Sequence, residues 1–143
     1  MLVHEVEKAR KQRKIAIYVS FLEIYNEKIY DLLNSSMFRS KKNQSGVDPN
    51  GLKLKWSNED LYTVENLFTF ECFSYDNIIQ LFHEGLKNKA IGSHKMNLSS
   101  SRSHSIFTVT LEQIDPSNPD NLIISKLQMV DLAGSERQSF TNV

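Results

Sequence analysis

Two polar loops, each attached to an apolar strand-like run, constrain the fold of this chain more than any other feature. The first loop, residues 97–104 (NLSSSRSH), runs directly into the strand-like residues 105–113. The second loop, residues 131–136 (DLAGSE), directly follows a second run at 123–131. A short polar connector with two prolines, residues 115–120, favours an antiparallel strand pair over a parallel crossover. Such a pair would bring both loops to the same end of a sheet.

The residue types in these loops suit the binding of a metal ion together with a phosphate. Mg²⁺ prefers hard oxygen ligands, which a serine hydroxyl and an aspartate carboxylate supply, the latter often through water. A glycine at the end of a strand lets backbone N–H groups approach a phosphate closely. The serine-rich loop alone would equally suit a flexible linker or a phosphorylation target. The downstream Asp-x-x-Gly sequence and the hairpin between the loops favour the phosphate site.

With these residues in view, the chain resembles the kinesin motor domain. Residues 97–104 and 131–136 resemble that family's switch I and switch II, respectively. Residues 21–33 (FLEIYNEKIYDLL) resemble its strand-and-turn segment, and residues 85–90 (GLKNKA) resemble its helix before switch I. These matches follow the family order over almost the whole chain, which makes the resemblance specific. The Ser-Ser-Arg-Ser-His pattern and the match at 21–33 speak against an unrelated GTPase.

The resemblance implies an α/β fold, as part of a P-loop NTPase motor domain of the kinesin/myosin type with a mixed central sheet and flanking helices. Residues 1–143 are then a partial kinesin motor domain. The phosphate-binding pattern Gly-x-x-x-x-Gly-Lys-Ser/Thr does not occur in the sequence. The family carries that pattern ahead of the helix expected to end at 2–14, and its main microtubule-binding helices follow switch II. Both segments are expected to be missing from this chain.

The resemblance also implies the ligands of a nucleotide site. Ser101 resembles the switch I serine near Mg²⁺ and the γ-phosphate, and Asn97 and Ser100 would lie beside the phosphate. Asp131 resembles the switch II aspartate that reaches the metal through water. Gly134 would donate its N–H to the γ-phosphate.

Arg102, Glu136 and Gly134 are the catalytic residues that the resemblance implies. Arg102 and Glu136 resemble the family's switch-to-switch salt bridge, which holds the attacking water in line. An ordinary surface ion pair contributes only about 0–1 kcal/mol to stability. As a gate, a salt bridge that must form between the two loops before the reaction, the pair would matter more, because phosphoryl transfer is catalysed mainly by positioning and electrostatics. His104 is expected to make a structural hydrogen bond rather than to transfer a proton.

The function implied is a portion of a kinesin-like motor that couples ATP binding and hydrolysis to movement on microtubules. Its expected cofactors are ATP and Mg²⁺, and its expected partner is tubulin, in the cytoplasm on the microtubule cytoskeleton. The parent protein would dimerise through a coiled coil. The alternative is a truncated, non-catalytic product that acts at most as a binding or interfering module. The 143 residues alone are expected to be inactive as an ATPase.

Composition agrees with a soluble intracellular chain. The formal net charge is zero, so charge gives no reason to expect nucleic acid or a membrane as a partner. Cys72 is the only cysteine, which excludes an internal disulfide and agrees with a reducing compartment. No apolar run approaches the roughly 18–20 residues of a membrane span.

Hydrophobic periodicity predicts the remaining elements. Strands are expected at 15–25, 52–56, 61–64 and 67–70, besides the two runs already named. Ile29, Leu32 and Leu33 have helical spacing, so a short helix or turn is expected there. A loop is expected at 34–51, and the end of a helix with a basic run at 2–14, either solvated or a binding patch. Lys53, Lys55 and Trp56 either face the filament, as the resemblance implies, or belong to an ordinary edge strand guarded by lysines.

A longer helix is predicted from Ser74 to about Ala90, before Gly92. Ser74 is a suitable N-cap, and Asp76 in the first turn suits the helix dipole. The spacing of five apolar residues predicts one buried face, made of Tyr75, Ile78, Ile79, Phe82 and Leu86. His83 is expected to be an ordinary histidine rather than a ligand. This helix would deliver the chain to the loop at 97–104.

Overall fold

A computed structural model describes residues 14–34, 51–56, 62–96 and 102–134 of the chain. The helix end expected at 2–14 lies outside the described residues except for Lys14, which instead begins a strand. The loop expected at 34–51 lies outside them except for its two end residues. Within the described residues, no helix is both long and apolar enough to cross a membrane.

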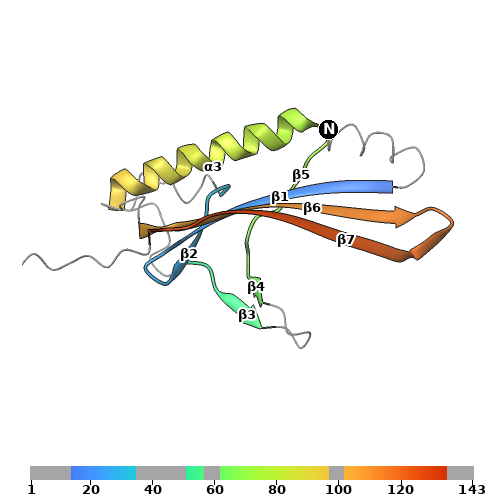
Figure 1. The fold of residues 1–143 in the computed structure, drawn as a ribbon, viewed down its shortest axis with the longest axis horizontal. Helices are drawn as coiled ribbons and strands as arrows, with labels where there is room; N and C mark the ends of the chain where they lie inside the picture. The colour runs from blue at the N-terminus through green and yellow to red at the C-terminus, as the bar shows by residue number, and fades with distance from the viewer. Residues whose placement is uncertain (1–13, 35–50, 57–61, 97–101, 135–143) are drawn as a thin grey trace, which may run out of the picture.

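One sheet forms the body of the described structure, and one helix covers a face of it (Figure 1). Its strands follow the order β2–β1–β6–β7, and β5 also pairs with β1. The pairings of β1 with β2, β5 and β6, and of β6 with β7, are antiparallel. The bounds are β1, Lys14–Tyr25; β2, Lys28–Asp31; β5, Phe70–Glu71; β6, His104–Asp115; and β7, Asn118–Asp131.

The β1–β2 hairpin corrects the short helix or turn expected around Ile29, Leu32 and Leu33. Asn26 and Glu27 both have positive φ angles, of 48° and 61°, and they form the two-residue turn between the strands. Two consecutive positive φ angles give the backbone twist of a tight hairpin, and asparagine tolerates that conformation well. The turn therefore overrides the helical spacing of the apolar residues and places Ile29 in a strand.

The antiparallel pair predicted before and after residues 115–120 is confirmed, and both strands are longer than expected. β6 and β7 stay in register from Ser105 opposite Asp131 to Ile114 opposite Leu122. The turn is tighter than predicted, because Asp115 already pairs with Asn118. The carboxylate of Asp115 accepts a hydrogen bond from the backbone N–H of Ser117 at 2.9 Å.

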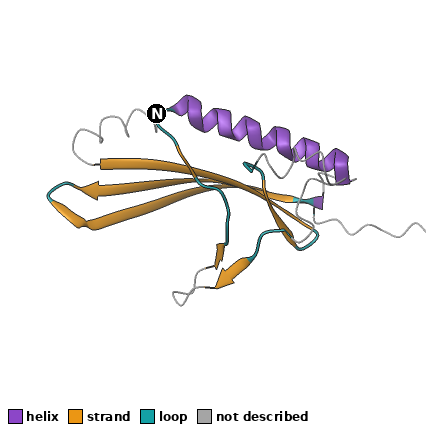
Figure 2. Cartoon of the chain, turned by 180° about the vertical axis from the view of Figure 1, so that it is seen from behind, coloured by secondary structure: helices purple, strands orange, loops and turns teal. Residues whose placement is uncertain are grey.

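A second, two-stranded sheet projects away from the face that the helix covers (Figures 1 and 2). It pairs β3, Leu54–Trp56, with β4, Tyr62–Val64, which confirms both predicted strands. The prediction of a strand at 67–70 is wrong for most of its length, because β5 begins only at Phe70. The N–H of Phe68 instead donates to Oδ2 of Asp31 at 2.7 Å, which takes this segment out of a sheet ladder.

The predicted helix is α3, Tyr75–Met96. Its cap is confirmed, because the Asn77 N–H donates to the Ser74 hydroxyl at 3.2 Å. The helix does not stop near Ala90 but continues through Gly92. A glycine inside a helix costs only about 1 kcal/mol relative to alanine, which is too little to end it here.

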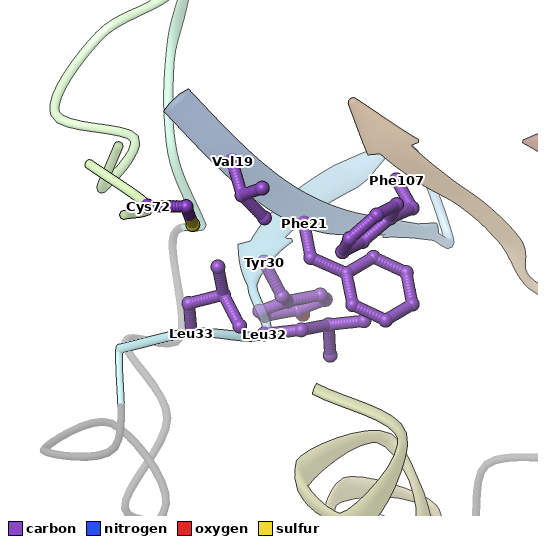
Figure 3. Close-up of a cluster of buried hydrophobic side chains, with 7 residues drawn as sticks. All are labelled: Val19, Phe21, Tyr30, Leu32, Leu33, Cys72 and Phe107. Carbon is purple, nitrogen blue, oxygen red and sulfur yellow. The ribbon is translucent and has the colours of Figure 1, made fainter. Parts of the chain in front are cut away.

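The core lies between α3 and the sheet, and Figure 3 shows its central cluster. Phe21 of β1 stacks on Phe82 of α3, with ring centroids 5.7 Å apart, and meets Phe107 of β6 edge-on at 5.2 Å. The predicted helix face is partly wrong, since Tyr75 and Leu86 are 54% and 41% exposed. The helix residues packed against the cluster are Ile78, Leu81, Phe82 and Ile91.

Candidate functional site

The described ends of the two polar loops, residues 102–104 and 131–134, lie together at one end of the β6–β7 hairpin, as the sequence predicted. His104 is the first residue of β6, and Ala133 lies two residues beyond the end of β7. The Ala133 N–H donates a hydrogen bond to Nδ1 of His104 at 2.9 Å. The expectation that His104 makes a structural hydrogen bond is confirmed. Because Nδ1 accepts, the imidazole in this arrangement is not protonated at that nitrogen.

Asp131 ends β7 and lies opposite Ser105 of β6. Its Oδ2 lies 3.3 Å from Nζ of Lys89, which reaches down from α3. The same Nζ donates to the Ser105 hydroxyl at 3.1 Å. The Lys89 side chain is only 12% exposed, whereas that of Asp131 is 76% exposed. The ammonium is thus held at the helix–sheet boundary, and the carboxylate remains open to a ligand.

Sequence reasoning missed Lys89, although a signal for it was present. The residue lies four positions after Gly85 and seven after Phe82, which puts it on the inward face of α3. A lysine on a packed helix face is rarely buried without a partner. A lysine at that position therefore predicts an anionic or hydroxyl partner on the facing strands.

Ser103 and Arg102 lie just before β6 and differ sharply in burial. Ser103 is 2% exposed, and its hydroxyl has no hydrogen-bond partner within the described part of the chain. Arg102 is exposed. The chain is therefore anchored at Ser103 and His104 while the preceding guanidinium points into accessible space.

The described residues include some of the predicted site and not the rest. Arg102, Asp131 and Gly134 are described, and the hairpin and the His104–Ala133 bond bring their segments to one place. The other predicted site residues lie outside the described residues: Asn97, Ser100, Ser101 and Glu136.

The chemistry of this end of the sheet fits Mg²⁺ held mainly by a nucleotide. In the described stretches, no group of three or more His, Cys, Asp or Glu side chains could hold a metal ion. Mg²⁺ seldom uses a cage built wholly of protein; it is usually bound by one or two carboxylates together with substrate phosphates and water. The exposed carboxylate of Asp131, opposite Ser105 on the neighbouring strand, matches that limited donor set.

Comparison with known proteins shows what this arrangement is similar to. The family described as the kinesin motor domain matches residues 1–143. The human kinesin-like protein KIF15 is 37% identical over 146 residues, covering 99% of this chain and 9% of KIF15. The human chromosome-associated kinesin KIF4A is 38% identical over 141 residues, covering 99% of this chain and 11% of KIF4A. The chain thus spans about a tenth of the length of these relatives.

Solved structures agree with the predicted fold. A fast kinesin, described with implications for its ATPase mechanism and interactions with microtubules, superimposes with a TM-score of 0.76 and 26% identity. That match covers 100% of this chain and 39% of the other. The C-terminal motor and motor homology domain of Kar3Vik1, fused to a synthetic heterodimeric coiled coil, superimposes with a TM-score of 0.73 and 25% identity. That match covers 98% of this chain and 33% of the other. The predicted fold class, part of a kinesin-type motor domain, is confirmed.

Proposed function

Because this chain belongs to the kinesin motor domain family, we propose that it forms the central part of a motor domain that hydrolyses ATP and moves along microtubules. The observation that carries the proposal is the hydrogen bond between His104 and Ala133, which joins the chain at the start of β6 to the chain just after the end of β7. Two loops that sense the same nucleotide must lie close together, and this bond supports that arrangement. The phosphate-binding loop and the later helices would come from residues outside this chain.

The loop residues then divide the contacts of a triphosphate among them. Ser101 would supply a hydroxyl to Mg²⁺, and Asn97 and Ser100 would bind phosphate oxygens. Asp131 would hold a metal-bound water, and Gly134 would donate its N–H to the γ-phosphate. A glycine suits this role because no Cβ keeps the phosphate away from the backbone. Mg²⁺ would neutralise charge on the phosphate oxygens.

Arg102 and Glu136 would form the gate between the loops. Arg102 is exposed and directly precedes the anchored residues Ser103 and His104. Glu136 follows Gly134 by two positions, so a short stretch of chain separates it from the hydrogen-bonded Ala133. The proximity of these segments supports an ion pair that orders the attacking water before phosphoryl transfer.

The proposed partners follow from the family. The complete protein would bind tubulin in the cytoplasm and would dimerise through a coiled coil outside this chain. The exposed lysines and tryptophan of the β3 region, Lys53, Lys55 and Trp56, would be candidates for a filament contact. Lys55 lies 3.8 Å from Glu65 across that small sheet, so part of its charge is already paired.

Steady-state phosphate release from the full-length protein, with and without polymerised tubulin, tests the proposal. We expect ATP hydrolysis that microtubules accelerate. Arg102→Ala should abolish most turnover while nucleotide binding persists, because the pair serves the transition state. The charge-swapped variant Arg102→Glu/Glu136→Arg should recover part of the activity. Absence of ATPase activity in both conditions would overturn the proposal. Normal turnover of Arg102→Ala would overturn the assignment of Arg102 and Glu136 as the gate.

A further inference from the structure

An open groove lies between the first half of α3 and the chain of β5, which leads from the sheet to the start of that helix (Figure 1). Its volume is about 470 Å³, within the usual range for ligand sites in proteins. Leu33 and Leu81 contribute aliphatic side chains to its lining, and Phe70 and Phe73 contribute aromatic ones. Phe73 is 70% exposed and Phe70 is 37% exposed, so both rings are accessible in the described structure.

The charged side chains of this groove are acidic. Glu71 of β5 and Glu84 of α3 belong to its lining, and within the described part of the chain no lysine, arginine or histidine does. Glu71 is exposed, and Glu84 is half-buried. Carboxylates next to aromatic faces attract an ammonium or guanidinium group, through charge and through cation–π contact. The groove therefore favours a cationic ligand that also carries apolar surface.

The wall formed by residues 70–73 is held in place before any ligand binds. The N–H of Cys72, between the two aromatic residues, donates to the Ile17 carbonyl of β1 at 2.7 Å. The N–H of Phe73 donates to Oδ1 of Asn77, in the first turns of α3, at 3.3 Å. A wall that is already ordered loses little conformational entropy when a ligand binds, which leaves more of the contact energy for affinity.

We propose that this groove docks a short basic peptide segment of a partner protein, in which lysine or arginine residues flank an aromatic or aliphatic one. The cations would lie near Glu71 and Glu84, and the apolar side chain would cover Phe70 and Phe73. A site for a small molecule usually encloses most of its ligand. This groove is open, so a peptide can lie across it with both ends in solvent. The proposal goes beyond the motor function and does not depend on it.

The groove is separate from the two surfaces that the proposed motor function uses. β5 pairs with the edge of β1 opposite to the one that pairs with β6, so the groove lies away from the β6–β7 hairpin. From Glu84, α3 continues to Met96, about 18 Å at 1.5 Å per residue, before the chain reaches the first loop. The candidate filament surface on β3 carries Lys53 and Lys55 instead of carboxylates, so a partner of one charge sign cannot suit both surfaces.

Fluorescence anisotropy of the labelled peptide Arg-Phe-Arg-Leu-Arg, titrated with the full-length protein, tests the proposal. We expect binding that weakens as the salt concentration is raised, and no binding of Glu-Phe-Glu-Leu-Glu, which has the same apolar residues and the opposite charge. Phe73→Ala should weaken binding about 5-fold and Glu71→Lys about 10-fold. Asp76→Lys is the matched control and should stay within about 2-fold of the wild type. Asp76 is an exposed carboxylate of α3 that does not line the groove.

Three results would overturn the proposal: no binding of the basic peptide up to about 1 mM, equal binding of the acidic peptide, or equal weakening by Asp76→Lys and Glu71→Lys. If Glu71→Lys does not fold, Gln80→Lys, at an exposed position of the same lining, replaces it with the same criterion. Sedimentation without peptide separates a partner from a second copy of this chain. A smaller assembly for Glu71→Lys would show that a second copy occupies the groove, and would overturn the choice of a partner protein. Absence of ATPase activity would count against the proposed function alone.

Discussion

The Nδ1 atom of His104 accepts the backbone N–H of Ala133 at 2.9 Å, which ties the start of β6 to the chain that leaves β7. The residues joined are 29 positions apart in sequence. The bond lies at the boundary between the regular hairpin and the two loops. It therefore joins the last residue of the first loop to the described part of the second loop.

Removing the acceptor at His104 should loosen the second loop. We expect His104→Ala to destabilise the protein by about 1 kcal/mol, the usual net value of one hydrogen bond. The local effect should be larger and specific, with faster hydrogen exchange of the Ala133 amide than in the wild type. His104→Asn, which can present an oxygen acceptor, serves as the comparison. Unchanged exchange at Ala133 in His104→Ala would show that the bond does not hold this segment.

Adding one methyl group at Gly85 should destabilise the contact between α3 and the sheet. A Cβ at this position would lie 2.7 Å from Cε1 of Phe21 and even closer to Cδ1. Phe21 cannot move easily, because Phe82 stacks on it and Phe107 packs against it edge-on. Overpacking costs about 1–3 kcal/mol, which exceeds the gain of about 1 kcal/mol that alanine brings to a helix.

Denaturant unfolding of the motor domain that carries Gly85→Ala tests this expectation. The exposed neighbour Lys87→Ala is the control and should change stability by only a few tenths of a kcal/mol. Phe21→Leu should relieve part of the penalty of Gly85→Ala in the double variant, because the ring that clashes is removed. A Gly85→Ala variant more stable than the wild type would contradict the packing described here.

Sequence reasoning was most successful where the signal is local. The Ser74 cap, the strand at β1 and the antiparallel β6–β7 pair follow from residue types within a few positions of each element. The hairpin at Asn26 and Glu27 was missed because positive φ angles, rather than apolar spacing, decide it. Lys89 was missed for another reason: its partners are 16 and 42 residues away. Only the folded sheet places them beneath the helix.

Asp31 should make stability fall as pH rises. Burial raises the pKa of its carboxyl above the ordinary 3.8. Hydrogen bonds from the backbone N–H groups of Phe68, Leu33 and Asn34 lower the pKa, but burial is the larger effect. The folded state therefore binds this proton more tightly than the unfolded chain does. The resulting stabilisation is fully present below the unfolded pKa and is lost as pH rises through the folded pKa.

Urea unfolding between about pH 4 and pH 7 compares the wild type with Asp31→Asn, which does not titrate. The free energy of unfolding of the wild type, measured relative to this variant, should decrease across that range. The N–H groups of Leu33 and Phe68 donate to separate carboxylate oxygens of Asp31, at 2.8 and 2.7 Å. Asp31→Asn should be less stable throughout this pH range, because the single oxygen of its amide cannot accept both hydrogen bonds. A relative gain for the wild type with rising pH would mean that the hydrogen bonds outweigh burial.

The last prediction concerns the 143 residues produced by themselves: they should bind Mg·ATP too weakly to detect and should aggregate. β7 lies at the edge of the described sheet, and six of its apolar residues are 41–53% exposed, namely Leu122, Ile123, Ile124, Leu127, Met129 and Val130. An apolar strand with an unpaired edge invites pairing with another copy. Phosphate contacts in such sites come largely from a P-loop, whose sequence this chain does not contain.

Calorimetry with Mg·ATP should therefore show no heat, and thermal scans should show a broad transition with light scattering. The full-length protein, measured in parallel, should bind nucleotide. Ile124→Lys in the isolated chain should reduce scattering without restoring ATP binding, because a charge on an edge strand opposes strand pairing but supplies no phosphate ligand. A sharp cooperative melt together with micromolar ATP binding would establish these residues as a self-sufficient domain. It would also remove the need for the rest of the motor domain in the proposed site.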